Sequence, residues 1–88
     1  MKYIYGDNRF TPADTIVGVD SSTSGSVIVY CVKHTNPTEA NSYYTLTVSS
    51  GTEVAVGQAL VENINFSKFD VIDMLAFNDN VTTIAFTA

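Results

Sequence analysis

The clearest pattern in the chain is a strict alternation of apolar and polar residues over 43–49. One side of this segment carries Tyr44, Leu46 and Val48, and the other side is rich in Thr. Because successive side chains of a strand point to opposite faces, the pattern predicts a half-exposed antiparallel strand. The segment 26–33 is apolar on both faces, which predicts a central strand or one covered on its second face by a neighbour.

The hydrophobic period changes in the second half of the chain. Val56, Leu60 and Ile64 recur every four positions, which predicts an amphipathic helix over about residues 51–65. The apolar stripe of this helix is expected to lie on the sheet. Gly57 costs about 1 kcal/mol inside a helix relative to Ala, so either it permits close packing, which we expect, or the helix tolerates the penalty.

The start of the helix has its own signal. Ser50 is followed three residues later by Glu53, which fits a capping box with Ser50 as the N-cap.

Four further segments have the composition of strands. They are residues 2–6, 14–20, 69–77 and 81–88. Gly18 predicts a bulge or a close approach, and residues 78–80 (Asn-Asp-Asn) predict that the last two strands form a hairpin. The stretch 6–14 has the composition of a turn-rich connection.

The order of elements is therefore β-β-β-β-α-β-β. It predicts a mainly β (α+β) fold with one domain over residues 1–88. Its architecture is expected to be a small, strongly bent antiparallel sheet, or an open barrel of about five to six strands, with the one amphipathic helix laid across it.

Composition limits the partners. The 88 residues are 45% hydrophobic and only 15% charged, with a net charge of −5. The basic residues Lys2, Arg9, Lys33 and Lys68 are scattered, whereas nucleic-acid binding relies on clustered Lys and Arg. Nucleic acid is therefore a disfavoured partner, although a ring would gather one Lys per subunit around its axis. In that arrangement the contacts are expected at Tyr3, Tyr43, Lys33 and Lys68, since aromatic rings stack on bases.

The single cysteine, Cys31, excludes an intramolecular disulfide and favours a reducing compartment. The first residues turn polar too early for a secretory signal, and no apolar run approaches the roughly 20 residues of a membrane span. We therefore expect a protein that is neither secreted nor bound to a membrane.

Catalytic and metal-binding patterns are weak. Cys31 and His34 have a C-x-x-H spacing, but the chain has no other Cys or His to complete a zinc site. Asp70 and Asp73 diverge on a strand, and His34 has no assigned partner for nucleophilic catalysis. The sequence predicts no cofactor, no metal, no small-molecule substrate and no enzymatic activity.

The last predicted strand, 81–88, has no Lys, Pro or bulge to blunt an exposed edge. Because one helix covers only one face of a sheet, either the sheet curls into a closed barrel or its remaining edge and face meet another copy. The second alternative is favoured for a small chain with few charges. The predicted interface of this homo-oligomer comprises Val81, Thr83, Ile84, Phe86, Val29, Tyr30 and Val32.

The layout from "MKYIYG" through "YYTLTVSSGTEVAVGQALVENINFSKFDVIDMLAF" resembles small uncharacterised proteins of marine phages (cyanophage type) and ocean metagenomes. In that class an alternating "YTLTV" strand leads through a turn into an amphipathic helix ending in "INxx". The sequence pattern is also similar to that of the Sm-like fold, a bent barrel that assembles into rings. Two features depart from it: the helix follows the fourth strand instead of preceding the first, and no Arg-Gly pair is present.

This resemblance implies a non-enzymatic, ring-forming protein with a structural or assembly role, located in the cytoplasm of an infected host cell or in the virion. The alternative it implies is an Sm-like ring that binds nucleic acid during RNA or DNA processing. Fold alone does not decide between the two.

Overall fold

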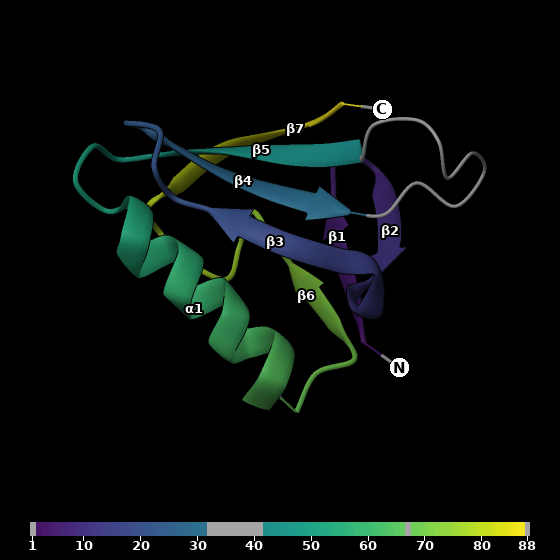
Figure 1. Ribbon diagram of the computed structural model, residues 1–88. Helices are drawn as coiled ribbons and strands as arrows, with labels where there is room; N and C mark the ends of the chain where they lie inside the picture. The colour runs from purple at the N-terminus through teal and green to yellow at the C-terminus, as the bar shows by residue number, and fades with distance from the viewer. Residues whose placement is uncertain (1, 32–41, 67, 88) are drawn as a thin grey trace.

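The computed structural model describes residues 2–31, 42–66 and 68–87. The elements along the chain are β1 (Tyr3–Gly6), β2 (Arg9–Pro12), the 3-10 helix η1 (Ala13–Thr15), β3 (Ile16–Asp20), β4 (Ser26–Cys31), β5 (Ser42–Val48), α1 (Glu53–Phe66), β6 (Val71–Asp73) and β7 (Val81–Thr87). The strands form two sheets, and α1 lies across one face of the larger sheet (Figure 1). The prediction of a mainly β (α+β) fold with one helix is confirmed, but the described strands close no barrel.

The larger sheet is antiparallel and has the strand order β3-β4-β5-β7. Its inner face carries the pairs Val29–Tyr44 and Leu46–Ile84, as the alternation predicts. The register between β3 and β4 shifts between Ile16 and Gly18, so the predicted bulge at Gly18 is confirmed.

The smaller sheet has the order β2-β1-β6, and its strand β2 lies in the stretch that the sequence predicts to be a connection. Asp7 and Asn8 both have positive φ angles, of 49° and 61°, and they form the two-residue turn between β1 and β2. Positive φ at both central residues is the geometry that matches the twist of a hairpin, and Asp and Asn tolerate it better than most residues. Pro12 limits β2 to an edge, which its place in the sheet satisfies.

The predicted hairpin of 69–77 and 81–88 is wrong. β6 has only three residues and pairs in parallel with β1, whereas β7 pairs antiparallel with β5. The strand ends at Asp73 because the Asp73 carboxylate and carbonyl accept hydrogen bonds from the N–H groups of Leu75 and Phe77, both at 3.0 Å. The single antiparallel sheet is thereby replaced by one antiparallel and one mixed sheet.

Helix α1 begins at Glu53 and not at 51, and Ser50 is not its N-cap. The Thr52 carbonyl accepts the first helical hydrogen bond, from Val56 N–H at 2.9 Å. Glu53 does reach back to backbone N–H groups, but these belong to Gly25 and Gly51. Gly25 ends the turn before β4, so Glu53 joins the helix start to a turn of the sheet.

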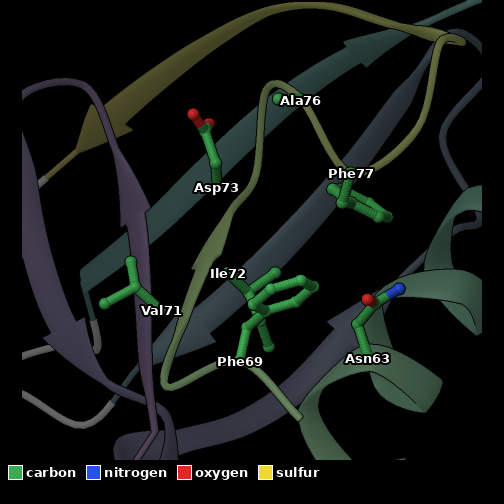
Figure 2. Close-up of a pocket in the computed structure, with 7 residues that line it drawn as sticks. All are labelled: Asn63, Phe69, Val71, Ile72, Asp73, Ala76 and Phe77. Carbon is green, nitrogen blue, oxygen red and sulfur yellow. The ribbon is translucent and has the colours of Figure 1, made fainter. Parts of the chain in front are cut away.

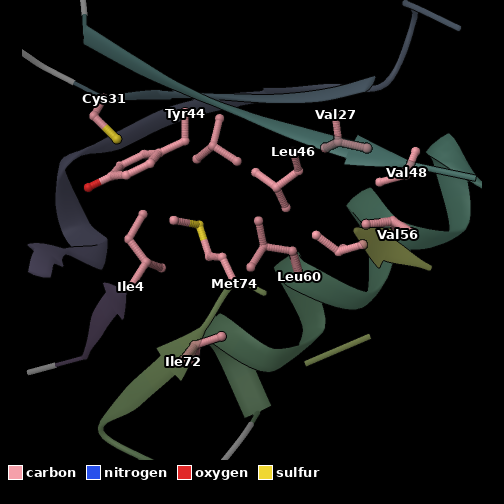
Figure 3. Close-up of a cluster of buried hydrophobic side chains, with 12 residues drawn as sticks. Ile4, Val27, Cys31, Tyr44, Leu46, Val48, Val56, Leu60, Ile72 and Met74 are labelled. Atoms are coloured by element: carbon pink, nitrogen blue, oxygen red, sulfur yellow. The ribbon is translucent and has the colours of Figure 1, made fainter. Parts of the chain in front are cut away.

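One hydrophobic core fills the space between the inner faces of both sheets and α1 (Figure 3). Its fully buried members include Ile4 from the small sheet, Tyr44 from the large sheet and Leu60 from the helix. The predicted helical stripe is confirmed, since Val56 and Leu60 are buried and Ile64 packs against them. Gly57 does permit close packing: a Cβ there would lie 2.5 Å from Ser21 Oγ.

Candidate functional site

The six described residues of the predicted oligomer interface do not share a surface. Val29 and Val81 are buried in the chain's own core, and Ile84 and Phe86 pack against that core from the inner face of β7. Tyr30 and Thr83 do lie on the outer face of the large sheet. Val32 lies outside the described residues. Val29 and Val81 are therefore withdrawn as interface residues, because contact with a second copy would require the core to open.

Strand β7 is an edge of the large sheet, as predicted, but part of that edge is covered. Asp7 Oδ2 accepts a hydrogen bond from Phe86 N–H at 3.0 Å, and the Arg9 guanidinium carbon lies 4.0 Å from the centroid of the Phe86 ring. Gly6 stands so close to Ile84 that a Cβ on Gly6 would collide with the Ile84 side chain. The β1–β2 turn thus satisfies an edge N–H group and places a cation over the ring beside it.

The outer face of the small sheet brings together neighbouring exposed and half-buried aromatic and apolar side chains. Two rows cross the strands: Pro12, Tyr3 and Val71 in one, and Phe10, Tyr5 and Asp73 in the other. We call the five apolar members of these rows the aromatic face. Phe10 is 62% exposed and Val71 44% exposed, while Ile4 and Ile72 on the opposite side are buried.

Two rings of the aromatic face are in contact with each other. The Tyr5 and Phe10 rings lie 4.6 Å apart between centroids, in a tilted arrangement that aromatic pairs favour. Asp73 is the one charged residue in the two rows. By comparison, the outer face of the large sheet is interrupted by exposed hydroxyl side chains such as Thr47 and Thr83.

The predicted nucleic-acid contacts are not brought together. Tyr3 lies on the aromatic face, whereas Tyr43 lies on the large sheet beside Tyr30, with ring centroids 5.7 Å apart. Lys68 is exposed between α1 and β6, and Lys33 lies outside the described residues. No shared groove of aromatic and basic side chains is formed by the three that are described.

The titratable candidates have structural surroundings. Cys31 is buried, and burial raises the pKa of its thiol, while a hydrogen bond with Thr15 partly opposes that rise. His34 lies outside the described residues. Within the described residues no three His, Cys, Asp or Glu side chains gather in a metal-binding group. Asp70 and Asp73 are both exposed. No helix over the described ranges is long and apolar enough to span a bilayer.

A second feature, which the sequence reading missed, is a pocket of about 380 Å³ between the end of α1 and the segment from 69 to 77. Figure 2 shows its lining, which comprises Asn63, Phe69, Val71, Ile72, Asp73, Ala76 and Phe77. One feature of the sequence indicates this pocket: the polar residue Asn63 directly precedes Ile64, which belongs to the apolar stripe of the helix. Ala76 and Phe77 reach the pocket through the turn after Asp73, where the sequence predicted that the strand continues.

Compared with known proteins, the chain matches no protein-family model, and no curated protein or solved structure is significantly similar to it. The resemblances to phage proteins and to the Sm-like fold therefore stay predictions.

Proposed function

We propose that this chain is a non-enzymatic structural or assembly protein that acts as a homo-oligomer, and that copies associate through the aromatic face. The observation that carries the proposal is the two-row array of Tyr3, Tyr5, Phe10, Pro12 and Val71 on one exposed sheet face. Contiguous apolar patches on small soluble proteins mark interaction sites, whereas single exposed apolar residues are ordinary.

The charge of the chain favours a second copy as the occupant. The net charge is −5, yet the aromatic face has Asp73 as its one charged neighbour in the two rows. A nucleic acid would need basic groups there, and a basic protein would be drawn to the acidic parts of the surface. A symmetric dimer places the same patch opposite itself, which an uncharged patch tolerates without repulsion.

The size of the aromatic face sets the expected strength of the association between copies. Three strands about 4.8 Å apart present a patch far smaller than the roughly 800 Å² that each partner buries in a standard interface. We therefore expect a reversible association in the micromolar range, with the aromatic face as its centre. A closed ring would need a second contact, for which the β3 edge and the outer face of the large sheet remain.

Native mass spectrometry at several protein concentrations and at low and high salt tests the proposal. We expect mass to rise with concentration and to be insensitive to salt. Phe10→Lys should weaken association more than about 10-fold, as expected for an aromatic residue near the centre of an interface. Thr83→Lys is the matched control, since it adds the same charge to the exposed outer face of the other sheet.

A monomer at every concentration would refute self-association. Loss of the oligomer in Thr83→Lys but not in Phe10→Lys would move the interface to the large sheet. Material absorbing at 260 nm that high salt removes would instead support the nucleic-acid ring. Lysine at Ile84 or Phe86 cannot distinguish these cases, because both side chains pack against the core.

A further inference from the structure

We propose that the pocket beneath α1 binds a small, neutral aromatic molecule that carries one N–H or O–H donor, of the indole or phenol class. A volume of about 380 Å³ lies within the range of small-ligand pockets. The pocket shares Val71 and Asp73 with the two rows of the small sheet, while its other lining residues lie outside those rows. The two proposals are tested by different variants, since Phe10 does not line the pocket.

The walls of the pocket favour a flat apolar ligand. Phe69 and Phe77 contribute two aromatic rings, and Ile72 and Ala76 complete an aliphatic surface (Figure 2). Aromatic rings prefer offset or edge-to-face contact with other rings, so a planar aromatic molecule gains more here than a branched aliphatic one.

Asn63 supplies the polar group, and its orientation is fixed. Its Nδ2 donates a hydrogen bond to the Ala59 carbonyl one helical turn earlier, at 2.8 Å. The amide oxygen is thereby turned toward Phe69 and Ile72, as Figure 2 shows. No residue in the described part of the chain donates a hydrogen bond to this oxygen. A ligand that displaces water from it must therefore bring a donor, or the oxygen is left unsatisfied.

Charge excludes ionic ligands from the pocket. The Asp73 carboxylate points away from the rings in Figure 2 and accepts the Leu75 N–H at 3.0 Å. No lining residue is basic, so an anionic ligand has no partner. A cationic ligand would lose its hydration without gaining a facing carboxylate.

The chain contains no Trp, so the emission of added indole can be followed directly. We expect the emission of indole to shift to the blue on addition of protein. 1-Methylindole, which has the same ring without the N–H donor, should bind about 3–10-fold more weakly, the ratio expected for one hydrogen bond. Asn63→Leu should abolish that preference, and Ala76→Leu should weaken both ligands by filling the pocket. Asn65→Leu, on the exposed side of α1, should change neither.

A second measurement uses the wild-type protein alone and does not depend on any variant folding. The Asn63 side-chain NH₂ cross-peak in a ¹H–¹⁵N spectrum should shift as indole is added over the same concentrations. The proposal is overturned if wild-type protein leaves the indole emission unchanged up to millimolar concentrations. It is also overturned if the emission shifts while the Asn63 cross-peak does not, or if Ala76→Leu binds both ligands as wild type does.

Discussion

The hydrogen bond between Thr11 and Tyr44 offers the sharpest test of how the two sheets meet. Thr11 belongs to β2 and Tyr44 to β5, and their hydroxyl oxygens lie 2.5 Å apart. Tyr44 is fully buried, and burial raises the pKa of its phenol while the bond to Thr11 partly opposes the rise. Tyr44→Phe keeps the ring, including its edge-to-face contact with Phe86, and removes only the hydroxyl.

The expected loss of stability has two contributions, the hydrogen bond itself and the hydroxyl group that is left without its partner. A net hydrogen bond contributes about 1 kcal/mol, and a buried hydroxyl left without a partner costs about 1–3 kcal/mol. Tyr44→Phe and Thr11→Val should each lower the free energy of unfolding by about 1.5–3 kcal/mol. The double variant should lose much less than the sum, because no hydroxyl is left unpaired. We expect a coupling energy of about 1–2 kcal/mol.

Urea unfolding followed by far-ultraviolet circular dichroism measures these values. A chain of 88 residues is expected to have a stability of about 4–13 kcal/mol, so each single variant remains folded. Protein concentration must be held where the mass is constant, since self-association adds to apparent stability. Tyr43→Phe paired with Thr11→Val is the control, because Tyr43 lies on the outer face and should show no coupling. Additive losses for Thr11 and Tyr44 would show that the two sheets are not joined at this point.

Three further predictions concern the helix. Leu60→Ala removes a fully buried side chain and should cost about 2–5 kcal/mol in urea unfolding; a loss below about 1 kcal/mol would place Leu60 outside the core. Gly57→Ala should stabilise the Ser21→Ala variant by up to about 1 kcal/mol. It should stabilise the wild type by less, because the new Cβ would meet Ser21 Oγ there. Equal gains in both proteins would contradict the close approach of Gly57 to Ser21. Hydrogen bonds from the backbone N–H groups of Gly25, Glu53 and Gly51 lower the pKa of Glu53 in the folded protein. The ionised carboxylate therefore stabilises the fold above the ordinary pKa of 4.5, and this stabilisation is lost as the pH falls through the lower pKa of the folded state. Glu53→Gln should therefore lower the melting temperature at pH 7 and match wild type in acid, with Glu62→Gln as the exposed control. A difference from wild type that does not change with pH would rule out the charge of Glu53 as the source of the stabilisation.

Local patterns in the sequence are sufficient for the elements whose side chains alternate or recur regularly. The stripe through Val56 and Leu60 and the alternating strand β5 follow from periodicity alone, because each is fixed by one face turning to the core. The bulge at Gly18 follows from a single residue type. These features need no knowledge of which strands pair.

Pairing between distant strands does not follow from such patterns. The parallel contact of β1 with β6 joins residues near 4 and 72, and nothing in either short segment specifies the other. The end of β6 was missed because Asp73 forms hydrogen bonds with its own backbone neighbours, which a strand pattern does not reveal. The pocket combines both effects, since Asn63 and Phe77 meet only once that turn exists.

The C-terminal strand shows how these two kinds of information combine. Its lack of charge and proline correctly predicts an edge, but the sequence does not reveal that Asp7 and Arg9 cover part of it. That cover is polar and comes from the turn of β1 and β2, whose opposite side bears the aromatic face. One hairpin therefore blunts the edge where pairing was expected and exposes a different apolar surface. If copies of this chain associate, that arrangement favours contact between sheet faces over continuation of the sheet through β7. A comparison of Phe10→Lys with Thr83→Lys distinguishes these two modes of association.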